Sequence, residues 1–291
     1  MCASDCNGHP RDVLRAHGLA ANQKLGQHFL LSADVADRIV REARVGPQDA
    51  VLEIGTGLGQ LTERLARAAA AVVTVEIDRG LCAIAKSRLA PYPNVILLHA
   101  DFLEGKHHIN PLVTDAVRSA GGGRVLKVVS NLPYQISSPA VINLLEWDLP
   151  VAEMDVMLQA EVVERLAAGP GTSEYGPLTV FAAYRATVDV LFSLPPSAFW
   201  PQPAVSSQFV RIMPHAPQPE ARSRDMFSQA VNKLFQSRRK TLARALRIGW
   251  GDDVADMVIR NLGLEPTRRP DTLTVAEFVA IADALPARDE C

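Results

Sequence analysis

Short apolar runs alternate with segments of helical periodicity between Ala50 and about Pro214, and this alternation restricts the possible folds more than any other feature of the chain. Strands that alternate with helices are typical of a mainly parallel sheet with helices packed on its faces. We therefore expect an α/β domain. The expected strands are Ala50–Ile54, Ala71–Ile77, Val95–Ala100, Val125–Val129 and Met154–Gln159, and helices are expected at Gln60–Arg67 and Gly80–Leu89.

The pattern changes toward the C-terminus. Leu178–Phe192 and Ser206–Met213 carry β-branched and aromatic residues and flank the proline-rich stretch Leu194–Pro203, which cannot be a central strand. They predict a closing antiparallel hairpin with a long loop. After Met213 a proline-punctuated linker leads into segments with helical periodicity. The expected helical segments of this small second domain are Asp225–Leu246, Asp252–Leu262 and Thr274–Ala284.

Two domains are therefore predicted, residues 1–213 and 214–291, with residues 1–22 as a flexible tail. Hydrophobic residues make up 48% of the chain and charged residues 21%, as in a globular protein. No apolar run approaches the roughly 20 residues of a membrane span, and the N-terminus does not resemble a secretory signal. We expect a cytoplasmic protein without a membrane partner. The scattered cysteines (Cys2, Cys6, Cys82 and Cys291) favour reduced thiols and no metal site.

A glycine-rich turn marks the first candidate site. The apolar run Val51–Ile54 continues directly into Gly55, Gly57 and Gly59 and then into an expected helix. Glycines allow a sharp turn and the close approach of a ligand to the backbone. The pattern fits NAD-binding folds and S-adenosylmethionine-binding folds about equally.

Two carboxylates follow the next two expected strands. Glu76 ends the strand after the glycine turn, at the offset expected of a residue that binds the ribose hydroxyls of an adenosine. Asp101 follows the third strand and could accept a hydrogen bond from the adenine amino group. No Lys-Ser/Thr pair follows the glycines, which disfavours hydrolysis of ATP or GTP. Together the strand ends predict a cradle for a nucleoside.

A four-residue motif, Asn131-Leu132-Pro133-Tyr134, follows the fourth expected strand. It resembles the N-P-P-Y-type motif of amino-methyltransferases, in the form typical of the ribosomal RNA adenine dimethylase family. A proline fixes the backbone, so that carbonyls and the Asn131 side chain can accept the hydrogens of one amine while Tyr134 offers an aromatic face. This chemistry needs neither a metal nor a strong base.

The resemblance to this family covers most of the chain and is closest to the members that modify the small ribosomal subunit. Lys24–Leu30 is similar to its entry motif, although the family often has Asn at the position of His28. Leu234–Leu242 is similar to a basic helix that opens its C-terminal domain. The resemblance implies cofactor contacts from His28, Leu30, Gly55, Gly57, Glu76, Asp101 and Asn131, catalytic roles for Asn131, Leu132, Pro133, Tyr134 and Phe199, and RNA contacts from Arg238, Arg239 and Lys240.

The same resemblance implies a Rossmann-like methyltransferase fold with a closing hairpin and a small all-α C-terminal domain. It implies an enzyme that uses S-adenosylmethionine to dimethylate the N6 amines of two adjacent adenines near the 3′ end of small-subunit rRNA during ribosome biogenesis. The small subunit and its rRNA would be the partners of a monomeric protein. Base stacking on Phe199 would contribute about 1–3 kcal/mol.

Three other functions remain as alternatives. The first is a large-subunit rRNA methylase that confers antibiotic resistance, and the second is a ribosome-assembly or transcription factor that has lost activity. The third, a hydride-transferring dehydrogenase, leaves the Asn131–Tyr134 motif unexplained. Two local features also stay open: the segment Lys106–Arg124, which includes His107 and His108, is longer than expected, and the run Arg238–Lys240 could be a solvated helix face.

Overall fold

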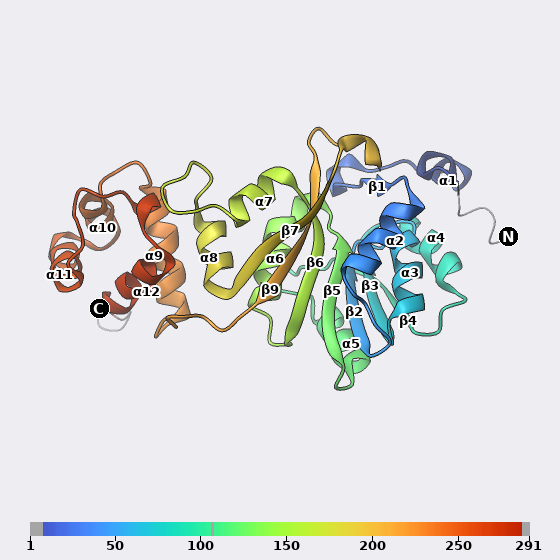
Figure 1. Ribbon diagram of the computed structural model, residues 1–291, viewed down its shortest axis with the longest axis horizontal. Helices are drawn as coiled ribbons and strands as arrows, with labels where there is room; N and C mark the ends of the chain where they lie inside the picture. The colour runs from blue at the N-terminus through green and yellow to red at the C-terminus, as the bar shows by residue number, and fades with distance from the viewer. Residues whose placement is uncertain (1–7, 106–107, 287–291) are drawn as a thin grey trace. The chain divides into compact units, whose positions relative to one another are not determined.

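The computed structural model describes residues 8–105 and 108–286, and the chain forms two compact units (Figure 1). Unit 1 consists of Met1–Val163 and Val188–Pro214, and unit 2 consists of Glu164–Thr187 and His215–Cys291. The boundary expected between residues 213 and 214 accounts for only part of this division. Unit 2 also takes an internal segment of the chain, which the composition change after Met213 did not indicate.

Unit 1 is built on a seven-stranded sheet in the order β4-β3-β2-β5-β6-β9-β7. Its first five strands in this order are parallel, and β9 pairs with β6 in the antiparallel direction. All six residues of β2 are buried, and four of them are apolar, as suits a central parallel strand covered on both faces. The strand bounds are β2 Asp49–Ile54, β3 Ala71–Glu76, β4 Val95–His99, β5 Val125–Asn131, β6 Val151–Gln159, β7 Ala186–Leu194 and β9 Ser207–Pro214.

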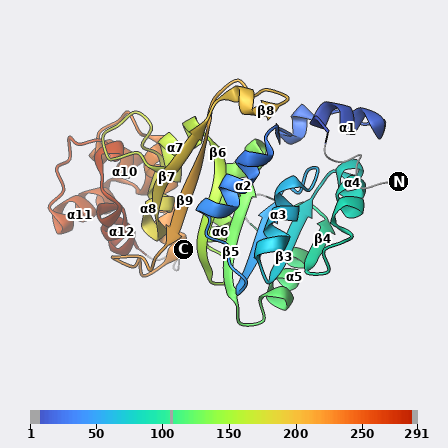
Figure 2. The same cartoon turned by 45° about the vertical axis from the view of Figure 1, so that its right-hand side comes forward.

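Helices cover both faces of this sheet. The chain moves outward from β2 to β4 through α3 and α4, and then returns to β5 and β6 through α5 and α6, so right-handed crossovers place the two pairs on opposite faces. Helix α2 packs against α3 (Figure 2). In residues 8–105 and 108–286, no helix combines the length and the apolar character that crossing a bilayer would require. The bounds are α2 Ala33–Glu42, α3 Gln60–Ala68, α4 Arg79–Leu89, α5 Pro111–Gly121 and α6 Ser137–Leu145.

The segment expected to form one strand, Leu178–Phe192, instead contains the helix α8 (Pro177–Arg185) followed by β7. Pro177 occupies the first turn of α8, where a missing N–H costs nothing, and the Thr179 hydroxyl accepts a hydrogen bond from the Gly176 N–H at 3.1 Å. Burial of apolar side chains in unit 2 overrides the strand propensity of this segment. The antiparallel return is as expected, because β9 lies beside β7 and the His215 N–H donates to the Arg185 carbonyl at 2.7 Å.

The N-terminal region departs from the expected flexible tail. Helix α1 (Pro10–Ala16) buries Val13 and Leu14 in a cluster with residues of unit 1, and the His9 side chain caps its first turn. A short 3-10 turn at Gln23–Leu25 then leads to β1 (Phe29–Leu30), which pairs with β8 (Phe199–Trp200). Residues 1–7, with Cys2 and Cys6, lie outside the described residues.

Unit 2 is helical. Tyr175, Tyr184, Phe227, Leu234 and Phe278 belong to its buried core. The expected helix Asp225–Leu246 is interrupted, because Ser237 ends α9 and the Thr241 hydroxyl caps α10. The helix bounds are α7 Ala160–Leu166, which spans the boundary of the two units, α8 Pro177–Arg185, α9 Arg224–Gln236, α10 Leu242–Trp250, α11 Asp252–Leu262 and α12 Val275–Ala284.

Candidate active site

A cavity of about 250 Å³ opens at the carboxyl ends of β2, β3 and β5 in unit 1. The chain reverses its direction of travel across the sheet between β2 and β5, and such a switch point is the usual ligand site of an open α/β sheet. The segment Leu25–Leu30, which contains β1, contributes to the cavity wall. All seven residues expected to contact a cofactor line this cavity, namely His28, Leu30, Gly55, Gly57, Glu76, Asp101 and Asn131.

The glycine turn brings the backbone of β2 against the Asn131–Tyr134 motif. Gly55 has a φ of 89°, a conformation that favours glycine, and a Cβ atom there would meet the Pro133 ring at 3.0 Å. Gly57 also has a positive φ, of 56°. The turn is therefore shaped by two needs, a left-handed backbone and direct contact with the motif on β5.

Glu76 is buried and holds the glycine turn to the end of β3. Its Oε2 accepts a hydrogen bond from the Gly57 N–H at 2.8 Å, and its Oε1 accepts one from the Asp78 N–H at 2.9 Å. Burial raises the pKa of Glu76, against the opposing effect of these hydrogen bonds. A carboxylate has about four acceptor sites, so two bonds to the backbone leave capacity for the two hydroxyls of a ribose.

Asp101 and Asp78 differ in their surroundings. Asp101 is exposed at the cavity wall, and its Oδ1 accepts a hydrogen bond from the Leu103 N–H at 3.1 Å. Asp78 instead caps α4, accepting from the Gly80 and Leu81 N–H groups at 2.8 and 3.1 Å. Asp78 is thus a structural cap, whereas Asp101 can reach a ligand.

Glu53, which no sequence motif indicated, also lines the cavity. Its side chain is 1% exposed, and its Oε2 accepts hydrogen bonds from Thr62 at 2.5 Å and from Thr74 at 2.7 Å. Burial raises the pKa of Glu53 to about 8. The available signal was the acidic residue inside the otherwise apolar run Ala50–Ile54, because a carboxyl group is rarely buried without a specific role.

Asn131, the last residue of β5, provides an acceptor that has no partner. Its Nδ2 donates to the His28 carbonyl at 3.0 Å, which fixes the orientation of the amide. Its Oδ1 is buried and has no hydrogen-bond partner among the described residues. Leaving a buried acceptor unsatisfied costs about 1–3 kcal/mol, and such an exception in a native site points to a ligand that supplies the missing donor.

Tyr134 is fixed by contacts on both its hydroxyl and its ring. The hydroxyl lies 2.6 Å from the Ser207 Oγ, and the ring stacks on His28 with centroids 4.9 Å apart. Burial raises the pKa of Tyr134, so the phenol stays neutral at ordinary pH. The His28 Nδ1 lies 2.6 Å from the Pro201 carbonyl oxygen, so this histidine joins the Tyr134 ring to the loop that follows β8. Leu132 is buried and anchors the motif.

Phe199 is buried and lies outside the residues that line the cavity. It is 2% exposed and belongs to a core cluster with Phe192 and Leu194. Pairing of Phe199 with Leu30 in the two-stranded β1–β8 sheet places its side chain in this core. The structure thus places Phe199 in the core, and its stacking on the target base stays a prediction.

The predicted RNA-binding residues of unit 2 lie in the turn between α9 and α10, and not on a helix as the sequence suggested. Arg238 is committed to internal contacts: its Nε pairs with Asp271 at 3.1 Å, and its Nη2 donates to the Thr172 and Ser173 carbonyls at 3.0 and 2.7 Å. Arg239 and Lys240 are exposed. Of the three predicted RNA contacts, Arg239 and Lys240 present their charges to solvent.

The segment Lys106–Arg124 contains the crossover helix α5, which packs against β3 and β2. Asn110 caps α5, and its Nδ2 donates to the Asp101 carbonyl at 3.0 Å. Lys106 and His107 lie outside the described residues, and His108 is exposed. Within the described ranges, no group of three or more His, Cys, Asp or Glu residues is arranged to hold a metal ion.

Comparisons with known proteins agree with this geometry. A family model described as ribosomal RNA adenine dimethylase matches residues 18–286. A protein of Caldanaerobacter subterraneus subsp. tengcongensis named ribosomal RNA small subunit methyltransferase A is 38% identical, covering 92% of this chain and 98% of its own. A Bacillus cytotoxicus protein of the same name is 36% identical, covering 94% of each chain.

Two solved structures share the fold. A dimethyladenosine transferase from Plasmodium falciparum superposes with a TM-score of 0.70 at 24% identity, covering 87% of this chain and 95% of its own. The 23S rRNA methyltransferase ErmE superposes with a TM-score of 0.62 at 22% identity, covering 88% and 99%. The expected α/β methyltransferase fold and enzyme class are confirmed. With most of its length matched, this chain belongs to the ribosomal RNA adenine dimethylase family.

Proposed function

We propose that the chain transfers methyl groups from S-adenosylmethionine to the N6 amines of two adjacent adenines near the 3′ end of small-subunit rRNA, giving dimethyladenosines. The observation that carries this proposal is the buried, unpartnered Oδ1 of Asn131 at the end of β5. Relatives at 36–38% identity are named for methylation of the small subunit, and the family is named for adenine dimethylation. The buried acceptor of Asn131 and the names of the relatives both support methylation of an adenine amine.

The residues of the cavity fit S-adenosylmethionine. Glu76 would bind the ribose hydroxyls, Asp101 would accept from the adenine amino group, and the left-handed Gly55 and Gly57 leave the backbone accessible beside them. When bound, S-adenosylmethionine supplies an electrophilic methyl group. Asn131 ends β5 beside the glycine turn, because a Cβ atom on Gly55 would lie 3.8 Å from the Asn131 carbonyl oxygen.

Orientation of the target amine is the task of the Asn131–Tyr134 motif. The exocyclic nitrogen of adenine is a weak nucleophile because its lone pair is conjugated with the ring. Asn131 Oδ1 can accept one N–H of that amine, and the backbone fixed by Pro133 offers carbonyls to a second, so that the lone pair turns away from the acceptors. A singly methylated amine retains one hydrogen, for which Asn131 Oδ1 alone suffices. The same acceptor therefore serves both transfers.

The alternative functions are less well supported. The large-subunit enzyme ErmE shares the fold at 22% identity, whereas the relatives that share 36–38% of their residues are named for the small subunit. Loss of activity in an assembly factor would leave no reason to keep Asn131, Glu76 and Asp101 together in one cavity. The monomeric state and the cytoplasmic location stay predictions.

The direct test supplies purified protein and methyl-labelled S-adenosylmethionine with either unmethylated small subunits or large subunits. We expect label only in small-subunit rRNA, and nuclease digestion should identify it as N6,N6-dimethyladenosine at two adjacent positions. The Asn131→Ala variant serves as the control for background transfer. Labelling of large-subunit RNA, or of a nucleoside other than adenosine, would contradict the proposal.

A further inference from the structure

Helices α2 and α3 of unit 1 border a second hollow, which is more open than the cavity at the strand ends. Four arginines line it, Arg41 and Arg44 from the end of α2 and Arg64 and Arg67 from α3, together with the acidic Asp37. Two valines supply apolar surface between them. None of the residues of this hollow lines the cavity described above, so the two sites are separate.

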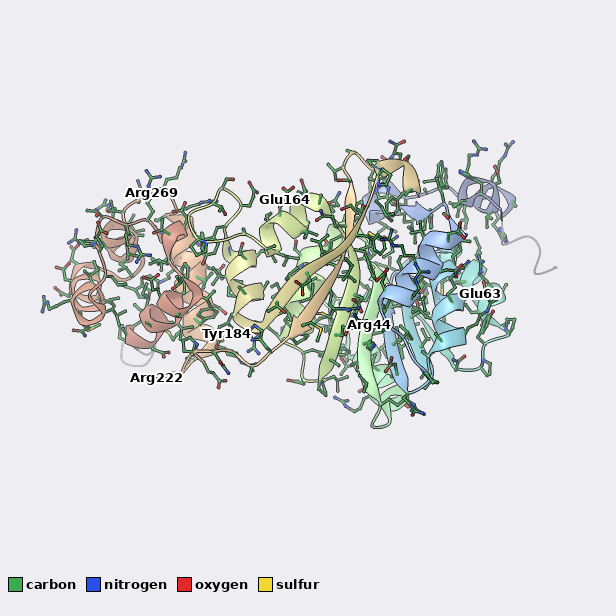
Figure 3. The ribbon with its side chains drawn as sticks, in the orientation of Figure 1. Arg44, Glu63, Glu164, Tyr184, Arg222 and Arg269 are labelled. Atoms are coloured by element: carbon green, nitrogen blue, oxygen red, sulfur yellow. The ribbon has the colours of Figure 1, made fainter. Side chains whose placement is uncertain are left out.

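The two arginines of α3 have acidic or polar partners. Arg64 Nε pairs with Asp37 Oδ1 at 2.5 Å, and Arg67 Nη2 pairs with Glu63 Oε1 at 2.5 Å. Arg67 Nε also donates to the Tyr92 hydroxyl at 3.1 Å. These contacts hold both guanidinium groups in place on α3, where Figure 3 labels Glu63. The side chains of α3 thus form an ordered wall of the hollow.

The two arginines of α2 differ from those of α3. Arg41 and Arg44 are exposed, and neither has an ion pair or a side-chain hydrogen bond to any residue in the described ranges 8–105 and 108–286. No ion pair among the described residues therefore engages their guanidinium groups, although Asp37 lines the same hollow. A guanidinium group binds phosphate oxygens through paired hydrogen bonds. Two guanidinium groups without ion pairs in the described part of the chain, beside the two that are held in place on α3, suit an anion with several oxygens.

The backbone at Arg44 gives a second, independent indication. Arg44 follows the last residues of α2 with a φ of 48°, a left-handed conformation that usually selects glycine or asparagine at a helix end. Lys127 holds this bend, because its Nζ donates to the Ala43 and Arg44 carbonyls at 3.1 and 3.0 Å. Arginine occupies a position where glycine would fit with less strain, and strain of this kind is typical of functional positions. Figure 3 labels Arg44 at this position.

We propose that this arginine hollow binds backbone phosphates of the substrate RNA, in a segment other than the one that carries the target adenines. The inference rests on the proposed function, which supplies a large structured RNA as the substrate. Helix α3 starts at Gln60, directly after the glycine turn, and Arg67 lies two turns further along the helix, about 10 Å from its start. Arg44 likewise precedes β2, at the edge of the sheet opposite the strand ends that form the cavity. The nucleotide that occupies the cavity would therefore not also contact the hollow.

The test is a double variant, Arg41→Gln with Arg44→Gly, in the full chain. Glycine at position 44 removes the charge and relieves the left-handed strain, so we expect a melting temperature at or above that of the wild type. The control is Arg118→Gln with Arg124→Gln, on the other face of the sheet, which removes one exposed positive charge from the last turn of α5 and one that follows the helix. The measurement is binding of unmethylated small subunits across a salt titration, by filter retention.

We expect the double variant to bind subunits more weakly and with a salt dependence lower by about 0.7–0.9 log units per tenfold salt for each phosphate that is no longer neutralised. The control variant should keep the wild-type slope, and the affinity of the double variant for S-adenosylmethionine should be unchanged. A wild-type slope in the double variant would overturn the inference. Equal slopes for the double variant and the control would do the same, because the effect would then be one of general charge.

Two further outcomes separate this inference from others. Binding of inorganic phosphate at micromolar concentration, abolished in the double variant, would identify a small-anion site and overturn the assignment to RNA. If the wild type methylates no adenine of the small subunit but the double variant still loses affinity for that RNA, the proposed function fails while the phosphate site stands. The binding assay does not depend on methyl transfer, so the two failures are distinguishable.

Discussion

The cavity of unit 1 and the α9–α10 turn of unit 2 present polar groups in opposite ways. In the cavity, Asn131 Oδ1 is buried without a partner among the described residues, and Glu76 is 5% exposed. In the turn, Arg239 and Lys240 are exposed to solvent. A buried group gains much from one correct ligand because water does not compete, whereas an exposed charge gains little from any single contact. The two regions therefore suit different tasks, selection of one amine and adhesion to a polyanion.

Because the buried acceptor selects the amine, the substitution with the largest expected effect on methyl transfer is at Asn131. Asn131→Ala removes the preorganised acceptor, and loss of one such group typically costs about 10²–10³ in rate, so single-turnover methyl transfer should fall by that factor. Affinity for S-adenosylmethionine should change only modestly. Asn131→Asp is the matched variant, since it keeps an acceptor but loses the donor to the His28 carbonyl, and it should retain more activity than alanine. Near-normal turnover by Asn131→Ala would remove this residue from the mechanism.

The second effect concerns cofactor binding. Glu76→Ala should weaken S-adenosylmethionine binding by about 1–3 kcal/mol, because two ribose hydroxyls and the N–H groups of Gly57 and Asp78 lose their acceptor. Calorimetric titration measures this directly. Asp78→Ala provides the contrast, since it removes a helix cap. It should lower the melting temperature and leave the affinity for S-adenosylmethionine nearly unchanged. Unchanged affinity in Glu76→Ala would place the ribose elsewhere.

A third prediction follows from the raised pKa of Glu53, about 8 in the folded protein against 4.5 for an ordinary glutamate. The folded state holds this proton more tightly than the unfolded state, so the stabilisation is present below pH 4.5 and is lost as the pH rises through 8. The free energy of unfolding of the cofactor-free protein should fall between these two pH values, and it should fall less in Glu53→Gln. Urea titrations at several pH values measure the two slopes.

Part of this slope should persist in Glu53→Gln. Burial also raises the pKa of Asp155, to about 7, although Arg211 pairs with it at 2.9 Å. Asp155 is unchanged in the variant, so its contribution of the same sign remains. Parallel slopes for the wild type and Glu53→Gln would show that Glu53 is ionised in the folded protein at neutral pH.

The smallest effects are expected in the α9–α10 turn, and they divide the basic run in two. Arg239→Gln with Lys240→Gln should lower the salt dependence of subunit binding by about 0.7–0.9 log units per tenfold salt for each RNA phosphate that the protein no longer neutralises. The melting temperature should not change. Arg238→Gln should instead lower the melting temperature by about 1–3 °C, because a partly exposed pair with Asp271 contributes little. If Arg238→Gln alone weakened subunit binding as much as Arg239→Gln with Lys240→Gln, Arg238 would be the RNA contact.

The cavity was predictable from sequence because each of its main residues sits at a strand end. Parallel strands bring their carboxyl ends to one edge, so Gly55, Glu76, Asp101 and Asn131 had to meet once the strands were identified. Glu53 was missed because it lies inside a strand and not at its end. Its neighbours Thr62 and Thr74 become relevant only through three-dimensional packing.

Other features depended on contacts that no local pattern reveals. Phe199 resembles a base-stacking residue by its sequence context, but its pairing with Leu30 buries it. The segment of α8 carries residues that favour strands, and its burial in the core of unit 2, beside α9 and α12, favours the helix. The Arg238 contact with Asp271 joins residues 33 positions apart, so the sequence could not show that one member of a basic run was already engaged.

The division of the chain also determines how its parts can be exchanged. The backbone passes from one unit to the other three times, after Val163, Thr187 and Pro214. A chain cut after Pro214 would retain Tyr175, Val180 and Tyr184 but lose Phe227 and the other C-terminal residues that bury them. The retained side chains would then form an apolar surface prone to aggregation. A chimaera that borrows the helical unit from a relative must therefore replace two segments at once, so recombination at a single crossover would not transmit this unit intact.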